Sequence, residues 1–205
     1  MEKLDIYNEN GEFIGTEERD VVHEKGLWHK TVHCWLYDKE GNVFFQKRKD
    51  RGTLYTTASG HLSAGESVTE AFQREIKEEI GLNIDANDAT LVNVVPFKLD
   101  RVKSDGSIFK DRAFANVYVD LYEGNYQDFT MDPNEVTAIV IVNAKDTLEL
   151  FQKENGTIEG KEITLKNEII ERNIDFKEFL VNEGETALEK YGEVLKKVIE
   201  LTKSY

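Results

Sequence analysis

The stretch GHLSAGESVTEAFQREIKEEIGL, from Gly60 to Leu82, is the most informative part of the chain. Ser67 and Glu70 stand at the S-x-x-E spacing of a capping box, which satisfies free backbone donors at a helix start. Gly81 can take the left-handed conformation that closes a last turn. The residues between these signals are good helix formers, and no proline interrupts them. The sequence therefore predicts one helix between Ser67 and Gly81.

Three carboxylates point to one side of this helix. With about 100° between successive residues, Glu78 lies about −60° and Glu79 about +40° from Glu75. An apolar stripe that should face a core overlaps them, made of Val68, Ala71, Phe72 and Ile76. Like charges beside a buried surface repel each other and are costly to desolvate. The pattern indicates bound cations, and carboxylate oxygens suit Mg²⁺ or Mn²⁺. The alternative is an ordinary solvated, charged helix face.

The spacing of the fixed residues carries a family resemblance. Gly60, Glu66 and the run from Arg74 to Leu82 match all nine fixed positions of the Nudix box, G-x5-E-x7-R-E-U-x-E-E-x-G-U with U aliphatic, across 23 residues. The chain therefore resembles a Nudix hydrolase. The resemblance implies an α/β fold, an α/β/α sandwich around a mixed β-sheet, in which the box forms a loop–helix–loop catalytic motif.

The resemblance also implies roles for residues of the box and nearby loops. Metal ligands would be the carboxylates of Glu75, Glu78 and Glu79 with the backbone carbonyl of Gly60. Arg74 and Glu66 would form an ion pair that orients the helix. Catalytic acids would be Glu78, Glu79 and Glu135, and the general base stays open among Glu79, Asp111 and Glu135. The implied reaction is hydrolysis of a diphosphate linkage in a nucleoside diphosphate derivative or a related organic diphosphate.

Residues other than the fixed positions of the box supply candidates for substrate binding. Arg48 and Lys49, before the loop that leads into the box, could contact phosphate or could be exposed charges at a hairpin end. His61 is expected to contact substrate or make a structural hydrogen bond instead of ligating a second metal. The four-residue spacing of His29 and His33 would suit metal ligation on a helix, but the local pattern indicates a strand. Aromatic candidates for stacking or for simple packing are Trp28, Tyr55 and Phe109.

One branch of the family is especially similar. Residues 28–36, 46–49 and 58–66, within a similar region from about 4 to 142, resemble isopentenyl diphosphate isomerase. Ser59 stands where that enzyme has its catalytic cysteine, and residues 110–113 lack its glutamate pair. His29 resembles a metal ligand of the isomerase, but the other parts of that site are not evident. These departures favour hydrolysis; the alternatives are an inactive nucleotide-binding or sensor module and, less favoured, the isomerase itself.

The composition of the chain restricts the class of binding partner and the cellular compartment that we expect. The 205 residues carry a net charge of −14, which disfavours binding to nucleic acid or to an anionic membrane. A small-molecule diphosphate is the expected partner, and a homodimer is possible. The lone Cys34 excludes an internal disulfide, lies in an apolar run that indicates a buried thiol, and fits a reducing compartment. With no signal-like or membrane-length apolar run, we expect a cytoplasmic protein.

Hydrophobic patterning divides the chain into elements of a single Nudix domain, residues 1–205. Residues 1–30 are expected to form an N-terminal hairpin and connector, with Asn10-Gly11 in the turn. A second hairpin is expected over 31–38 and 42–48, and strands over 90–102, 109–121 and 137–142. A helix is expected over 144–153. The C-terminal extension, 154–205, is expected to hold a short hairpin at 157–164, a lid-like excursion up to 184, and a terminal helix over 186–202.

Overall fold

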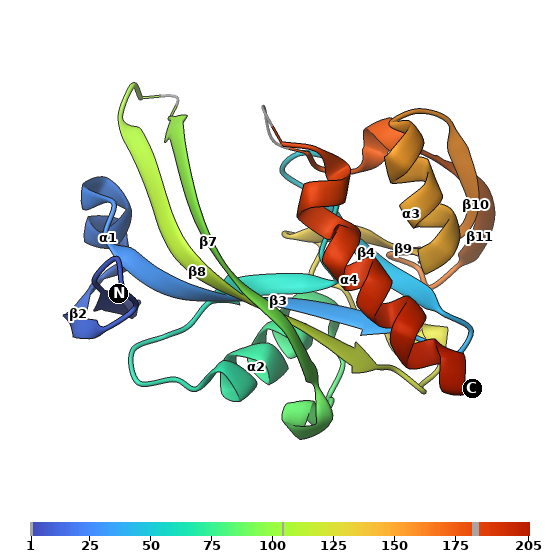
Figure 1. The fold of residues 1–205 in the computed structure, drawn as a ribbon, viewed down its shortest axis with the longest axis horizontal. Helices are drawn as coiled ribbons and strands as arrows, with labels where there is room; N and C mark the ends of the chain where they lie inside the picture. Colours follow the sequence, from blue (N-terminus) through green and yellow to red (C-terminus); the bar gives the residue numbers. More distant parts are fainter. Residues whose placement is uncertain (1, 104, 182–184) are drawn as a thin grey trace.

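The computed structural model describes residues 2–103, 105–181 and 185–205 (Figure 1). Its helices are α1 (Arg19–Lys25), α2 (Val68–Ile80), α3 (Ala144–Lys153) and α4 (Ala187–Leu201). Its strands are β1 (Lys3–Tyr7), β2 (Phe13–Glu18), β3 (Trp28–Tyr37), β4 (Asn42–Arg48), β5 (Leu54–Tyr55), β6 (Ala58–His61), β7 (Thr90–Val102), β8 (Ile108–Leu121), β9 (Val136–Asn143), β10 (Thr157–Thr164) and β11 (Ile169–Asp175).

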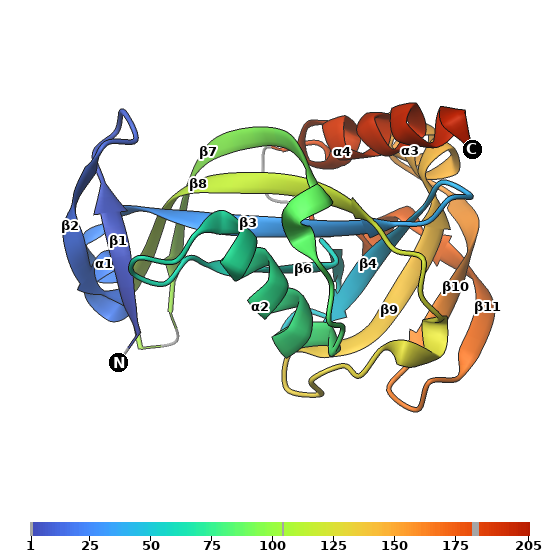
Figure 2. The same cartoon turned by 90° about the horizontal axis from the view of Figure 1, so that it is seen from below.

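These strands form one mixed sheet with helices on both of its faces. Its main path, among the described residues, runs β11-β10-β9-β4-β3-β1-β2, while β5, β6, β7 and β8 branch from it. Helix α2 covers one face, and α3 with α4 covers the other (Figure 2). The predicted α/β/α sandwich with a mixed sheet is confirmed.

The central strand β3 supplies side chains to both layers because successive residues of a strand point to opposite faces. Cys34 and Leu36 join the core beneath α2, which also contains Phe72 and Ile76. Trp35 joins the core beneath α3 and α4. Cys34 is fully buried, so the predicted burial of its thiol is confirmed. A strand buried on both faces explains the nearly continuous apolar run in this part of the sequence.

The local signals for α2 have the expected geometry. The Ser67 side chain accepts a hydrogen bond from the backbone N–H of Glu70, and the Glu70 carboxylate accepts one from the backbone N–H of Ser67. Gly81 closes the helix with φ 77°, and a Cβ there would lie 2.6 Å from the carbonyl oxygen of Thr130. The capping box and the C-terminal glycine predicted from sequence are therefore confirmed.

The predicted hairpin over residues 31–38 and 42–48 is confirmed as an antiparallel connection, but its ladder is shorter than expected. The two strands exist, but β3 and β4 pair only at Tyr37↔Val43. From there they diverge: β3 runs parallel to β8 over ten residue pairs, and β4 pairs antiparallel with β9. Apolar strands buried on both faces need a partner on each side, and neighbours in sequence cannot supply both.

The C-terminal region is more regular than the sequence indicates. Strand β10 pairs with β9 and β11 pairs with β10, so residues 157–175 extend the main sheet instead of forming a lid-like excursion. The end of the expected excursion, residues 182–184, lies outside the described residues. Thr186 caps α4, whose Tyr191, Leu195 and Val198 pack into the core. Across the described ranges, the helices are too short or too polar to span a membrane.

Candidate functional site

Two of the three candidate ligand acids on α2 are buried against the sheet. Glu75 is 8% exposed and Glu79 is 4% exposed, whereas the side chain of Glu78 is 60% exposed. Residues four apart lie one turn above each other on the same face of a helix, which places Glu75 and Glu79 together. Glu78 lies on the water-facing edge of that face. The three acids therefore share one side of α2 but experience very different degrees of desolvation.

Arg74 links the acids of the Nudix box to each other and to the neighbouring strand. Its Nε donates to Glu66 at 2.8 Å and its Nη2 donates to the same carboxylate at 2.9 Å. Its Nη1 donates to Glu75 at 2.6 Å and to Glu78 at 3.1 Å. Nη2 also donates to the carbonyl oxygen of His61 at 2.8 Å. The planar, five-donor guanidinium suits this number of acceptors.

Gly60 lies on β6 directly against the acid pair. A Cβ built at this position would overlap the carboxylate of Glu75. The position requires glycine because of this close approach, not because of its backbone conformation. Because Gly60 has no Cβ, β6 can lie close to α2, and the Gly60 backbone packs directly against the Glu75 carboxylate.

A bound cation would stabilise the buried carboxylates of Glu75 and Glu79. Burial, together with the nearby charges of Glu75 and Glu135, raises the pKa of Glu79 to about 8. Burial also raises the pKa of Glu75, against the opposing effect of Arg74. Glu79 accepts hydrogen bonds from Gln46 at 2.8 Å and from the backbone of Ser59 at 3.2 Å. Crowded carboxylate oxygens are the donor set that Mg²⁺ and Mn²⁺ prefer, so these residues fit a hard divalent ion.

The three candidates for the general base lie in two places. Glu135 lies just before β9, is exposed, and acts electrostatically on both Glu75 and Glu79. Glu79 is itself part of the buried acid pair. Asp111 lies on β8 next to His29, with Oδ1 3.4 Å from the His29 Nε2. All three line one cleft, but Glu135 is the water-accessible acid next to the Nudix box.

That cleft has a volume of about 950 Å³ and contains most of the predicted site residues. Arg48 and His61 line it, and Arg48 is held by Asp50 at 2.9 Å. Lys49 is exposed and does not line it, so the structure separates Lys49 from the remaining candidates. Further cations that sequence reasoning did not select also line the cleft, among them Arg51 and Lys190.

The aromatic candidates have different surroundings. Tyr55 lines the cleft and lies between two cations, with Lys190 5.4 Å and Arg48 6.0 Å from its ring centroid. Phe109 also lines the cleft and stacks on His23. Trp28 instead stacks on Phe114 with ring centroids 4.6 Å apart, and it is absent from the cleft lining.

Three of the four histidines in the chain meet at one end of the cleft. The ligand atoms of His23, His29 and His61 all lie within 4.8 Å of one another. His29 therefore has two imidazole neighbours that were not evident from the sequence, while the expected role of His61 in substrate contact or a structural hydrogen bond stays a prediction. The three residues are 38 positions apart in sequence at their extremes, so only the fold brings them together.

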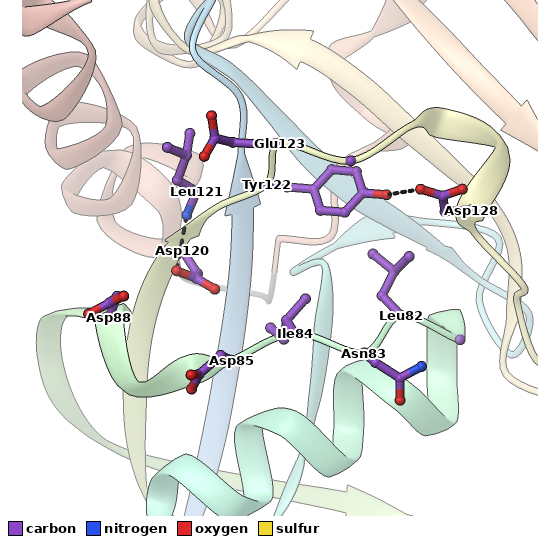
Figure 3. Close-up of a pocket in the computed structure, with 12 residues that line it drawn as sticks. Leu82, Asn83, Ile84, Asp85, Asp88, Asp120, Leu121, Tyr122, Glu123 and Asp128 are labelled. Atoms are coloured by element: carbon purple, nitrogen blue, oxygen red, sulfur yellow. Dashed lines mark hydrogen bonds between the residues drawn. The ribbon is translucent and has the colours of Figure 1, made fainter.

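A second pocket, of about 630 Å³, lies beyond the C-terminal end of α2 (Figure 3). Aspartates 85, 88, 120 and 128 point toward it, and Asp120 accepts a hydrogen bond from the backbone of Leu121. None of the predicted site residues lines this pocket.

Comparison with known proteins identifies the same motif. A family model for the NUDIX domain matches residues 27–164. An uncharacterised Nudix hydrolase of Clostridium acetobutylicum is 36% identical over 149 residues, which cover 68% of each chain. The isopentenyl-diphosphate Delta-isomerase of Serratia proteamaculans is 28% identical over 131 residues, 62% of this chain and 69% of that one. Nudix hydrolase 3 of Arabidopsis thaliana is 29% identical over 163 residues, only 21% of its own length.

A solved structure supports the fold. The crystal structure of a Deinococcus radiodurans protein superposes with a TM-score of 0.53, covering 74% of this chain and 89% of that chain at 21% identity. The similarity extends over most of the sandwich.

Proposed function

Because the chain belongs to the Nudix hydrolase family, we propose that it cleaves the diphosphate linkage of a nucleoside diphosphate derivative or related organic diphosphate, using Mg²⁺ or Mn²⁺. The observation that carries this proposal is the pair of buried carboxylates, Glu75 and Glu79, facing the backbone of Gly60. A pure binding site has no need for two repelling, desolvated acids. A diphosphate hydrolase has that need, since its ion must be held beside phosphate oxygens.

Four groups would hold the ion. They are the carboxylates of Glu75 and Glu79, the exposed carboxylate of Glu78, and the carbonyl oxygen of Gly60. When bound, the ion neutralises charge on the diphosphate oxygens. Arg74 keeps Glu75 and Glu78 oriented through its hydrogen bonds, and Glu66 keeps Arg74 in place.

Glu135 is our choice for the general base. It reaches water in the cleft, and its charge already acts on both buried acids. In the reaction, a water oxygen forms a bond to phosphorus while the bridging P–O bond of the diphosphate breaks. Glu135 takes the proton of the attacking water, and the two products leave with one phosphate group each. Asp111 is less suited because it faces His29 at the other end of the cleft.

Cations along the cleft would hold the substrate. Arg48 and Lys190 lie beside the ring of Tyr55, and Arg51 and His61 line the same cleft. Tyr55 offers a ring face to a flat leaving group. The net charge of −14 makes a small diphosphate a better substrate than a polymeric nucleic acid, because only local cations offset the repulsive field.

The test is a mass-spectrometric screen of nucleoside di- and triphosphates, dinucleotide polyphosphates, nucleotide sugars, ADP-ribose, thiamine diphosphate and isopentenyl diphosphate. It is run with Mg²⁺, with Mn²⁺ and with chelator, beside the Glu79→Gln variant. Metal-dependent cleavage by the wild type alone supports the proposal. Binding without cleavage of any compound supports a sensor. An allylic isomer without phosphate release restores the isomerase, to which the chain is 28% identical in the matched region.

Three further expectations belong to this proposal. We propose that residues 1–205 act as one domain, supported by the single sheet that joins the N-terminal hairpin to β10 and β11. A homodimer stays a prediction, to be tested by light scattering of the purified chain. The cytoplasmic location also stays a prediction, to be tested by fractionating cells that produce the protein.

A further inference from the structure

Helix α4 supplies a lysine to the cleft from outside the part of the chain that the NUDIX family model matches. Lys190 lies on α4 and lines the cleft, whereas the matched region ends at residue 164. The Lys190 side chain is only 11% exposed, compared with 32% for its ion-pair partner Glu185. A lysine that served only this ion pair would extend its amine into water, as surface lysines normally do. Here the amine turns inward, toward the cleft.

Two aromatic rings and one carboxylate surround the amine of Lys190. Its Nζ lies 5.4 Å from the ring centroid of Tyr55 and 5.8 Å from that of Tyr191. Burial lowers the pKa of Lys190, but the rings and the carboxylate of Glu185 favour the charged form. An ammonium group has three donors, and among the described residues Glu185 accepts from one of them, at 3.3 Å. The amine can therefore donate to a ligand in the cleft.

His33 holds the ring of Tyr55 beside this amine. The Tyr55 hydroxyl lies 3.4 Å from Nε2 of His33, and the two rings meet edge to face with centroids 5.7 Å apart. Burial lowers the pKa of His33 to about 4, and the charge of Lys190 lowers it further, so the imidazole is neutral at pH 7. His33 thus orients Tyr55 without adding a charge of its own.

The charges around Tyr55 leave a positive excess. Asp50 binds Arg48 at 2.9 Å and lies 3.6 Å from Arg51, while Glu185 pairs with Lys190. Three cations therefore face two carboxylates, in a chain whose net charge is −14. A local excess of positive charge with low exposure to water favours an anionic group of a ligand.

The other acids that α4 contributes to the cleft have partners elsewhere. Glu189 accepts a hydrogen bond from the hydroxyl of Thr186 in the capping box of the helix, at 2.9 Å. Glu193 accepts one from the side-chain amide of Asn93 on β7, at 2.8 Å. Neither carboxylate is the ion-pair partner of Lys190, so they do not cancel the positive excess beside Tyr55.

The cations follow one another along the cleft from the Nudix box. The charge of Glu79 acts on Arg48, whereas the charges that act on Lys190 are those of Glu185 and Arg51. The guanidinium carbon of Arg48 lies 6.0 Å from the ring centroid of Tyr55, and Lys190 lies against the same ring. Arg48 is therefore the cation nearer the box acids. A diphosphate held at those acids would reach Arg48 first, and a group beyond the diphosphate would reach Lys190.

We propose that Lys190 binds a third phosphate group of the substrate, next to the diphosphate that is cleaved. A lysine amine is a compact charge with rotating donors, which suits a phosphate oxygen. The favoured substrate class is then a compound with at least three linked phosphates, such as a nucleoside triphosphate or a dinucleotide polyphosphate. This inference deepens the proposed function and rests on it for the position of the diphosphate.

Preference for the longer phosphate chain is measured by calorimetry on the full chain with Mg²⁺ present. The probes are methylenediphosphonate and its three-phosphorus homologue bis(phosphonomethyl)phosphinate, in which carbon replaces the bridging oxygens and prevents cleavage. The wild type should bind the three-phosphorus probe about 10-fold more tightly, as expected for one hydrogen bond between charged groups. Lys190→Gln should lose this preference and keep the wild-type affinity for methylenediphosphonate.

Two further variants control the measurement. Lys196→Gln removes an exposed lysine from the same helix and should bind both probes as the wild type does. Lys190→Arg keeps a cation and should still prefer the longer probe. An equal loss of affinity for both probes in Lys190→Gln would mean that Lys190 is purely structural. Equal affinity of the wild type for both probes overturns the subsite even if Lys190→Gln does not fold.

Binding of these probes is independent of turnover, so the two proposals can fail separately. A preference that depends on Lys190, in a protein that hydrolyses nothing in the screen, leaves the subsite standing and removes the proposed function. Hydrolysis by a wild type without this preference does the reverse. If the screen finds cleavage of triphosphates, Lys190→Gln should raise KM for them about 10-fold and leave KM for nucleotide sugars unchanged.

Discussion

The side-chain amide of Gln46 donates a 2.8 Å hydrogen bond to the carboxylate of Glu79, across 33 residues of sequence. This contact ties the buried end of α2 to β4. The hydrogen bond lowers the free-energy cost of burying the charged form of the Glu79 carboxylate. Burial has the larger effect, and it raises the pKa of Glu79 to about 8.

The first prediction concerns the stability of the metal-free protein. A carboxyl whose folded pKa is raised from 4.5 to about 8 stabilises the fold fully below pH 4.5, and that contribution is lost as pH rises toward 8. Glu79→Gln removes the charge and keeps the volume. Metal-free Glu79→Gln should therefore unfold at a higher temperature than the wild type at pH 8, with a smaller difference at pH 5. Equal melting temperatures at both pH values contradict the assignment.

The second prediction separates the acids by their burial. Glu79→Gln should lower kcat by about 100-fold or more with the fold retained, because it removes a central ligand. Glu78→Gln should have a smaller effect, since the Glu78 carboxylate is 60% exposed and hydrogen-bonded to Arg74. Steady-state kinetics on the substrate found in the screen measures both. Wild-type activity in the double variant would refute the metal site at these acids.

The third prediction tests the close approach at Gly60. A methyl group there overlaps the Glu75 carboxylate, so Gly60→Ala should displace the acid and remove most activity, at a stability cost of about 1–3 kcal/mol. Gly192→Ala is the matched control. A Cβ at Gly192 meets only Leu188 at 3.8 Å, and alanine favours the α4 helix, so the control should match or exceed wild-type stability. Denaturant unfolding and turnover are measured on both.

The fourth prediction uses the geometry of Arg74. Lysine keeps the charge but has no planar fork, so it cannot donate simultaneously to Glu66, Glu75 and His61. Arg74→Lys should lower the free energy of unfolding by about 2 kcal/mol and reduce Mg²⁺ affinity. Arg172→Lys, in a similar pair of ion contacts between Glu162 and Glu178, provides the comparison. Stability should fall in both variants, but metal affinity should fall only at Arg74.

Local signals in the sequence predicted the parts of the fold that depend on residues close together along the chain. The capping box and the Gly81 turn fix α2, and the bounds of β7 and α3 follow from their own patterning. The Glu66–Arg74 ion pair, which the resemblance to the Nudix box implied, is also present. Each of these features is decided within about ten residues of chain.

Pairing between distant segments is what the sequence did not reveal. The structure pairs β3 with β4 through a short turn and also with the distant strand β8 in parallel, and no local signal in the apolar run of β3 marks β8 as the second partner. The histidine cluster escaped detection for the same reason, because α1, β3 and β6 meet only after that sheet forms. Lys190 enters the cleft from α4, and no motif marks it.

The parallel pairing of β3 and β8 also constrains when the sheet can form while the chain is being synthesised. Trp28 pairs with Arg112 and Tyr37 with Leu121, in each case 84 residues later (112 − 28 and 121 − 37). During translation the central strand must wait for β8 to leave the ribosome, with an apolar edge open to water or to chaperones. Asp111 arrives on that same strand. The cleft is therefore completed late, and a nascent chain shorter than about 121 residues has the Nudix box but not the sheet that makes it a site.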